Sequence, residues 1–206
     1  ENIAEEVFDF QLRHSTEHPL VLIKASAGGG GMGIEEVDDI DQFRSVYRRV
    51  RNYAARQFKD EGVLIEQRIM DYNHVEVQIL GDNYGNVVHL FERDCSLQRR
   101  YQKVVEFSPA FSVDKKIRQA LYEDAVKIAK HVGYVNAGTL EFLVDREGHH
   151  YFIEMNPRIQ VEHTVTEMVT GVDLVRSQIL IAEGCPLSDP RIGIRKQSDL
   201  HLNGYA

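Results

Sequence analysis

The stretch 153-IEMNPRIQVEH-163 alternates polar residues with mostly apolar ones. The polar row consists of Glu154, Asn156, Arg158, Gln160 and Glu162, and each of these side chains can bind or move an ion. Because successive side chains of a β-strand point to opposite faces, the row is predicted to project from one side of a strand. A strand that faces water would show the same alternation, so the stretch alone leaves open whether the row meets solvent or a substrate.

The composition is that of an ordinary globular chain and excludes several classes of partner. Its 206 residues are 43% hydrophobic and 27% charged, which suits one large or two small domains. No apolar run approaches the roughly 20 residues of a membrane span, and no signal peptide opens the sequence, so no membrane partner is expected. The net charge of −8 argues against nucleic acid. Cys95 and Cys185 give no disulfide framework, which predicts a reducing compartment, either bacterial cytoplasm or mitochondrial matrix.

Periodicity predicts short strands interspersed with amphipathic helices. Helices are expected at 2–14, 39–58, 114–132 and 164–183, where apolar residues recur at helical spacing. Asp38 or Asp39 is expected to cap the second helix. A basic loop is expected at 98–103. Strands are expected at 20–25, 34–37, 63–67, 74–81, 87–93, 138–144 and 151–155, the last four forming two hairpins.

The second hairpin predicts a pair of facing carboxylates. If its turn centres between Glu147 and Gly148, Glu141 lies opposite Glu154, with Cβ atoms roughly 5 Å apart. Like charges repel at that distance, whereas a Mg²⁺ ion between them makes the arrangement favourable, and Asn156 adds an oxygen on the same face. Two exposed glutamates are the alternative reading of this pair.

The rest of the polar row favours a site over a solvated face. Arg158 is suited to hold a planar oxyanion through two hydrogen bonds. Glu162 is suited to act as a general base in a site tuned by Arg158, and Gln160 lies between them in the row.

A glycine run predicts a phosphate-binding flap. Gly28, Gly29, Gly30 and Gly31 expose backbone N–H groups that can wrap phosphate oxygens, and Lys24 precedes them as a point charge. The run is neither a P-loop nor a dinucleotide fingerprint, since a strand and not a helix is expected next. A floppy surface loop is the alternative. Glu66, at the end of the strand 63–67, is placed to accept a hydrogen bond from a ribose, with the backbone of 67–69 beside an adenine edge.

Several segments together resemble the ATP-binding core of biotin carboxylases, which are ATP-grasp enzymes. They are 24-KASAGGGGMG-33, 74-HVEVQILGD-82, 92-ERDCSLQRRYQKVVE-106, 137-AGTLEFLV-144 and 152-FIEMNPRIQVEHTVTEMVTGVDLV-175. The resemblance covers nearly the whole chain, and 133–138 and 162–168 are most similar to the pyruvate carboxylase branch. It implies an α+β ATP-grasp fold, with a B subdomain carrying the glycine-rich flap at 1–68 and a C-terminal core, truncated at its end, at 69–206.

The resemblance also implies a role for each matched position. The phosphates of ATP would be held by Lys24 and Gly28–Gly31, and Mg²⁺ or Mn²⁺ by Glu141, Glu154 and Asn156. The adenosine pocket would be lined by Glu66, Gln67, Ile69, His74 and Gln98. Bicarbonate and biotin would be surrounded by Lys103, Arg158, Gln160, Val161 and Glu162, with Glu162 as the base that deprotonates bicarbonate.

The implied reaction has two steps. Bicarbonate attacks the γ-phosphorus of ATP to give carboxyphosphate and ADP. Carboxyphosphate then releases CO₂, its phosphate takes the proton from biotin N1, and biotin captures the CO₂. The implied partners are a biotin carrier domain and a carboxyltransferase domain, in a parent protein that forms a homo-oligomer.

The sequence is also compatible with other functions. The chain also suits the biotin carboxylase of an acyl-CoA carboxylase, or another ATP-grasp ligase that joins a carboxylate to an amine. Met32, Gln67, Tyr101 and Pro157 depart from the family pattern, and the first three favour a non-catalytic nucleotide-binding module. Because 201–206 reads as a strand cut short, the sequence is expected to be a fragment. The resemblance implies that the family's N-terminal domain and an arginine beyond the C-terminal end are missing, so the fragment is expected to turn over little or not at all.

Overall fold

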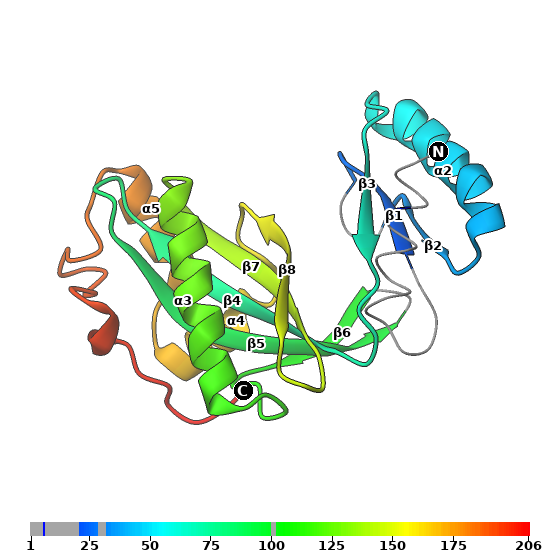
Figure 1. The fold of residues 1–206 in the computed structure, drawn as a ribbon. Coiled ribbons are helices and arrows are strands. Elements are labelled where there is room, and N and C mark those ends of the chain that lie inside the picture. Colours follow the sequence, from blue (N-terminus) through cyan, green and yellow to red (C-terminus); the bar gives the residue numbers. More distant parts are fainter. Residues whose placement is uncertain (1–5, 7–20, 29–31, 100–101) are drawn as a thin grey trace. The chain divides into compact units, whose positions relative to one another are not determined.

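The computed structural model describes residues 6, 21–28, 32–99 and 102–206. Contacts divide the chain into two units: Glu1–Met70 with Arg100–Gln102, and Asp71–Arg99 with Lys103–Ala206. The expected helix at 2–14 (except Glu6), the glycines Gly29–Gly31 and Tyr101 lie outside the described residues. Figure 1 shows the elements of each unit.

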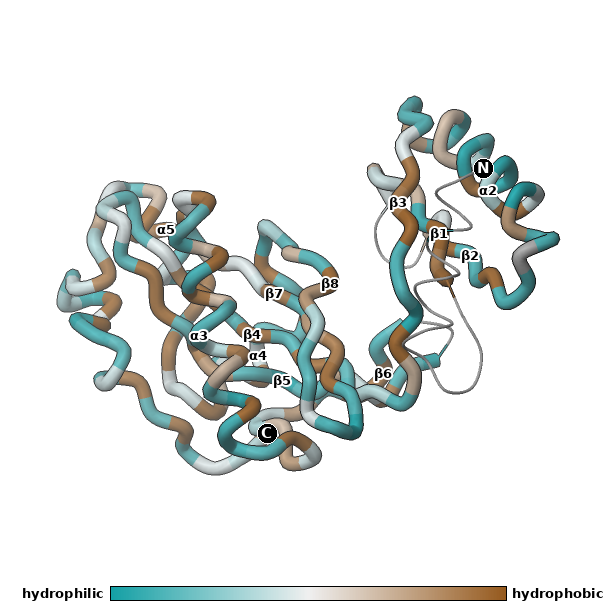
Figure 2. The backbone as a smooth tube through the Cα atoms, viewed as in Figure 1, coloured by the Kyte–Doolittle hydropathy of each residue, from teal (hydrophilic) through white to brown (hydrophobic). Residues whose placement is uncertain are grey.

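The first unit is a three-stranded antiparallel sheet packed against one helix. The sheet has the order β2-β1-β3, from β1 (Val21–Ala25), β2 (Ile34–Val37) and β3 (Val63–Gln67). Helix α2 (Ile40–Phe58) begins at Asp39, whose carboxylate accepts a hydrogen bond from the Asp41 N–H at 2.9 Å. Figure 2 shows the hydrophobic residues of the sheet beside a largely hydrophilic α2. The core comprises Val21, Ile23, Ala25, Val37, Val46, Val50 and Ala54.

The second unit is built on a five-stranded sheet of order β6-β5-β4-β7-β8. Its strands are β4 (Asn73–Gly81), β5 (Val87–Arg99), β6 (Gln102–Phe107), β7 (Asn136–Val144) and β8 (His150–Asn156). Its helices are α3 (Lys115–His131), α4 (His163–Thr170) and α5 (Leu174–Ala182), followed by the short 3₁₀ helix η1 (Gln197–Asp199). Antiparallel sheets with separate helices confirm the predicted α+β class.

Both faces of this sheet are covered, and successive side chains of β4 point alternately to one face and the other. Val75, Val77 and Ile79 pack with α3 in one core cluster. Leu80 packs with Leu174 of α5 in another. Since Glu76 and Gln78 alternate with the residues that meet α3, their side chains leave from the face opposite α3. That face therefore carries buried polar groups at one end and an apolar core at the other.

Two predicted elements differ from the structure. The single helix expected at 164–183 is broken, because Gly171 ends α4 in the left-handed region at φ 73° and Asp173 caps the start of α5. The prediction of a basic loop at 98–103 is wrong for the residues that the structure describes there. Gln98 and Arg99 end β5, and residues 102–103 begin β6. None of the described helices is both long enough and apolar enough to cross a membrane.

Candidate active site

The β7–β8 hairpin brings two carboxylates face to face. Glu141 pairs directly with Glu154, so both side chains leave from the same face of the sheet, as the sequence predicted. The turn itself does not centre where expected, because Val144 pairs with His150. A register shift between Glu141 and Phe142, which leaves Ile153 without a direct partner, restores the predicted pairing.

The polar row does not continue as one strand face. Strand β8 ends at Asn156, and the segment 157–162 is a loop, so the expectation of a continuous strand is wrong for its second half. Pro157 starts that loop, where the missing N–H costs no ladder hydrogen bond. Gln160 and Glu162 are nevertheless buried, at 6% and 9% exposure. Alternation alone could not predict this, because the loop and not the strand directs them inward.

Arg158 and Val161 lie apart from the buried members of the row. Val161 is 91% exposed. The Arg158 side chain is exposed as well, and its Nη1 donates to the Ile159 carbonyl at 3.3 Å. A role for either residue therefore depends on a bound molecule that meets them from outside.

Glu141 is the meeting point of several hydrogen-bond donors. Its Oε2 contacts His74 Nε2 at 2.6 Å, and its Oε1 accepts from Asn156 Nδ2 at 2.8 Å and from Gln160 Nε2 at 3.3 Å. Burial by itself raises the pKa of this carboxyl, but the His74 hydrogen bond and the Lys103 charge outweigh burial and lower the pKa to about 2. The Glu141 carboxylate is therefore ionised at neutral pH.

Lys103 bridges three carboxylates. Its Nζ pairs with Glu76, with Glu141 at 2.9 Å and with Glu162 at 3.1 Å. Burial opposes its charge, but the carboxylates of Glu76 and Glu141 outweigh burial and raise the Lys103 pKa well above its ordinary value. Lys103 is thus a fixed cation between the three carboxylates of this site.

Glu162, the predicted base, is a buried carboxylate paired with Lys103. Burial raises its pKa, whereas a hydrogen bond with its own backbone N–H and the charge of Lys103 lower it on balance. The carboxylate is therefore ionised and held at one oxygen by Lys103. Glu106, on β6, has the opposite shift, because burial and the charges of Glu162 and Glu76 raise its pKa.

Sequence reasoning missed Glu76 and Arg93, which complete the network. Glu76 pairs with Arg93 across β4 and β5, and Arg93 Nε donates to Glu76 Oε1 at 2.5 Å. The signal was present in 74-HVEVQILG-81, since its alternation puts Glu76 on the same face as His74. Charge complementarity across the first hairpin then points to Arg93.

The predicted adenosine residues are divided between the two units. In the second unit, Gln98 Nε2 contacts His74 Nδ1 at 2.7 Å, which extends the Glu141 network to Gln98. In the first unit, Lys24 forms an ion pair with Glu66. Gln67 ends β3 and is exposed, and Ile69 follows it half-buried.

Of the four glycines in the predicted phosphate loop, the structure describes Gly28. Its N–H donates to the Ala25 carbonyl at 3.0 Å. A Cβ added at Gly28 would lie 2.7 Å from the Met32 carbonyl oxygen, closer than any side chain tolerates. The close approach of these two backbone segments explains a glycine at this position.

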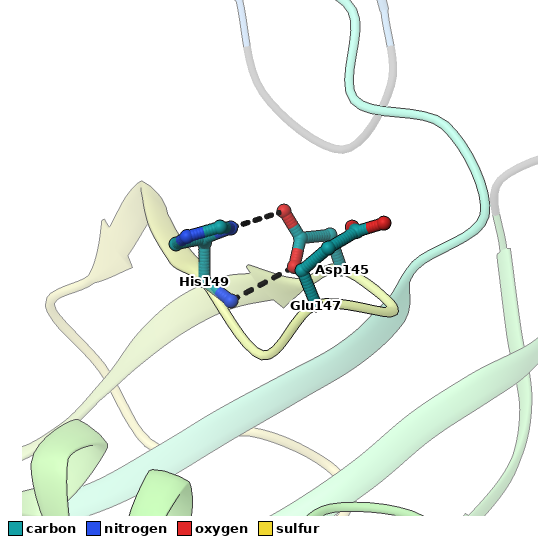
Figure 3. A group of neighbouring side chains, drawn as sticks. All are labelled: Asp145, Glu147 and His149. Atoms are coloured by element: carbon teal, nitrogen blue, oxygen red, sulfur yellow. Dashed lines mark hydrogen bonds and ion pairs between the residues drawn. The ribbon is translucent and has the colours of Figure 1, made fainter.

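The turn of the β7–β8 hairpin holds a separate group of possible ligands. Figure 3 shows Asp145, Glu147 and His149, whose ligand atoms lie within 4.8 Å of one another. Asp145 accepts from the His149 N–H at 2.8 Å and from the Tyr151 hydroxyl at 3.0 Å. These bonds stabilise the turn, and the group includes none of the predicted metal ligands.

The donor set at Glu141, Glu154 and Asn156 fits a hard divalent cation. All three offer oxygen atoms, the ligands that Mg²⁺ prefers. Among the described residues the Glu154 side chain has no hydrogen-bond or ion-pair partner, although it directly faces another carboxylate. Asn156 turns its Nδ2 to Glu141, which leaves its Oδ1 available. A cation beside Glu154 would relieve the repulsion between the two carboxylates.

Comparisons with known proteins agree with one another. A sequence model of the family described as "Carbamoyl-phosphate synthase L chain, ATP binding domain" matches residues 4–190. Pyruvate carboxylase of Schizosaccharomyces pombe is 53% identical over 186 residues, which are 90% of this chain and 15% of that protein. Mitochondrial pyruvate carboxylase of Homo sapiens is 52% identical over 186 residues, with 90% and 16% covered.

Solved structures give the same result. The chain matches a biotin carboxylase–beta-gamma-ATP complex from Campylobacter jejuni with a TM-score of 0.87 and 42% identity, covering 98% of this chain and 43% of that one. It matches the biotin carboxylase domain of Hydrogenobacter thermophilus 2-oxoglutarate carboxylase, in complex with MgADP, ADP and bicarbonate, with a TM-score of 0.85 and 46% identity, covering 98% and 42%. The chain thus spans about one sixth of these two curated relatives and less than half of these solved chains.

Proposed function

This chain belongs to the family of carbamoyl-phosphate synthase L chain ATP binding domains, with the ATP-grasp fold of biotin carboxylases, and on that premise we propose what it does. It is part of a biotin carboxylase that uses ATP, Mg²⁺ and bicarbonate to carboxylate biotin. Relatives named pyruvate carboxylase, at about 50% identity, favour the first half-reaction of that enzyme. The observation that carries the proposal is Lys103 bound to Glu162 beside the facing pair Glu141 and Glu154.

The first step is the attack of a bicarbonate oxygen on the γ-phosphorus of ATP. Glu162, ionised and buried, accepts the proton of bicarbonate and so raises its nucleophilicity. Lys103 supplies a fixed positive charge where the carboxyphosphate anion forms. Phosphoryl transfer depends on positioning and charge neutralisation more than on covalent help, which suits a site made of fixed charges.

The metal site is assigned to Glu141, Glu154 and Asn156. When bound there, Mg²⁺ (or Mn²⁺) neutralises phosphate oxygens of the nucleotide. The residues of this chain supply the oxygen ligands and fix their orientation. The hydrogen bonds from His74 and Gln160 to Glu141 do so.

The remaining residues are assigned to binding. Lys24 and the loop from Gly28 to Gly31 hold phosphates, and the adenosine is lined by Glu66, Gln67, Ile69, His74 and Gln98. Exposed Arg158 and Val161, with buried Gln160, meet bicarbonate and biotin. In this proposal residues 1–68 form the flap subdomain and 69–206 the core.

The parent protein would supply the other partners. We assign to it a biotin carrier domain, a carboxyltransferase domain and a homo-oligomeric assembly, in bacterial cytoplasm or mitochondrial matrix. Because the chain spans only part of its relatives, the isolated 206 residues are expected to show little or no turnover.

The test is ATP hydrolysis by the full-length protein that contains this segment. Hydrolysis should depend on bicarbonate and increase when free biotin is added. Hydrolysis that depends on neither bicarbonate nor biotin, but increases with another carboxylate and an amine, would contradict the proposal and indicate a different ATP-grasp ligase.

A further inference from the structure

Arg93 is a fully buried cation whose N–H groups are all engaged. Its side chain has 0% exposure. It can donate five hydrogen bonds. Five acceptors meet them: Glu76 Oε1 at 2.5 Å, Thr166 Oγ1 at 2.7 Å, Gln78 Oε1 at 2.9 Å, Gln160 Oε1 at 3.3 Å and Thr139 Oγ1 at 3.4 Å.

The first consequence concerns Lys103. Arg93 binds one oxygen of Glu76, so the other oxygen is directed at Lys103. Lys103 in turn contacts Glu162. The position of the proposed base therefore depends on Arg93 through two intermediate residues.

The second consequence concerns Gln160. Because Arg93 has only donors, it must face the oxygen of the Gln160 amide, and the Nε2 group is then left to face Glu141 at 3.3 Å. Arg93 thereby fixes which way the amide points in the loop 157–162. The same loop carries Glu162.

Thr166 links this arrangement to helix α4. Its side chain is buried, with 1% exposure, and its hydroxyl accepts from Arg93 Nη1 at 2.7 Å. A hydrogen bond to a charged group in a buried site is stronger than one between neutral groups. The start of α4 immediately follows Glu162, so this bond holds the loop end and the guanidinium together.

We propose that Arg93 is a positioning residue of the active site, oriented by Thr166, that holds Glu76 and Gln160 so that Lys103 and Glu162 keep their working geometry. The inference rests on the proposed function. Arg93 itself touches neither substrate nor metal in this account. It acts through Glu76 and Gln160.

The experiment uses the full-length protein that contains this segment, with Thr166→Val as the test variant. This change keeps side-chain volume and removes the acceptor for Arg93. Thr170→Val is the matched control, since Thr170 lies one turn along α4 and bonds the Thr166 carbonyl at 2.7 Å without contacting Arg93. Thr166→Ser is the rescue variant because it restores the hydroxyl.

Steady-state kinetics and thermal unfolding separate positioning from folding. Thr166→Val should lower kcat for bicarbonate-dependent ATP hydrolysis about tenfold and change KM for ATP less than about twofold, as expected for one charged hydrogen bond. Thr166→Ser should restore kcat to within about twofold of the wild type. Thr170→Val should lower the melting temperature comparably but leave kcat within about twofold.

Two results would overturn the inference while the proposed function stands. They are full activity in Thr166→Val, or equal losses of kcat in Thr166→Val and Thr170→Val. A wild-type protein with no bicarbonate-dependent hydrolysis would instead overturn the proposed function, and this inference with it.

Discussion

The ammonium of Lys103 lies 3.1 Å from the carboxylate of Glu162, and the same nitrogen contacts Glu141 at 2.9 Å. One cation therefore joins the proposed base to a proposed metal ligand. In the proposed mechanism an anionic nucleophile and a phosphate meet beside these opposite charges. The groups are largely shielded from solvent, so water screens their charges only weakly.

Glu162→Gln should abolish most of the chemistry without unfolding the protein. The amide keeps the shape of the side chain but cannot accept the proton of bicarbonate. We expect kcat for bicarbonate-dependent ATP hydrolysis to fall by about 10²–10⁴, the range typical of a general base. Glu183→Gln, at an exposed position, is the control and should leave kcat unchanged. A Glu162→Gln enzyme with wild-type kcat would remove Glu162 from the mechanism.

Glu154→Gln should weaken metal use more than it weakens the fold. Among the described residues the Glu154 side chain has no hydrogen-bond partner that the substitution would remove. We expect the Mg²⁺ concentration for half-maximal activity to rise about 10–100-fold, with an unchanged or higher melting temperature, because a like-charge repulsion is removed. An unchanged Mg²⁺ requirement would show that the facing pair is not the metal site.

Stability should depend on His89 at mildly acidic pH. Burial lowers the His89 pKa from its ordinary 6.5 to about 4, so the folded state takes up a proton less readily than the unfolded chain. The contribution of neutral His89 is present above about pH 6.5 and is lost as pH falls towards 4. His89 also stacks on Tyr122, with ring centroids 4.2 Å apart, which an aromatic replacement can keep.

Urea unfolding at several pH values tests this point. His89→Phe should flatten the fall in the free energy of unfolding between about pH 6.5 and 4, relative to the wild type. His201→Phe, at an exposed position, should leave the slope as in the wild type. Equal slopes in His89→Phe and wild type would contradict a buried neutral His89.

Gly28→Ala should distort the phosphate loop. The added Cβ would meet the Met32 carbonyl oxygen at 2.7 Å, which forces the backbone apart. We expect a cost of about 1–3 kcal/mol to the first unit and a higher KM for ATP. Ala27→Ser, at the exposed neighbouring position, is the control. An unchanged KM in Gly28→Ala would argue that this loop does not hold phosphates.

The sequence predicted the elements well where periodicity was strong. Helix α3 (Lys115–His131) and the β7–β8 pairing follow from apolar spacing and from a short hairpin. The break at Gly171 was missed because the apolar spacing continues across it, whereas its backbone takes a positive φ. The second half of β5 (residues 94–99) and the whole of β6 were missed because the charged residues there resemble a loop.

The candidate site was predictable only in part. Glu141, Glu154 and Asn156 follow from alternation within one hairpin. The burial of Gln160 and Glu162 depends on a loop after Pro157, whose path no alternation determines. Charge complementarity across the first hairpin pointed to Arg93, but its direct pairing with Glu76 depends on the register shift between Val77 and Ile79, which the sequence pattern does not show.

The most direct test of the account follows oxygen from bicarbonate labelled with oxygen-18. If a bicarbonate oxygen attacks the γ-phosphorus of ATP, that oxygen stays on phosphorus when carboxyphosphate breaks down. Mass spectrometry of the inorganic phosphate released by the full-length protein should then show one labelled oxygen per phosphate, and Glu162→Gln should release little labelled product. Phosphate that carries no label while ATP is consumed would mean that water is the nucleophile, which contradicts the account.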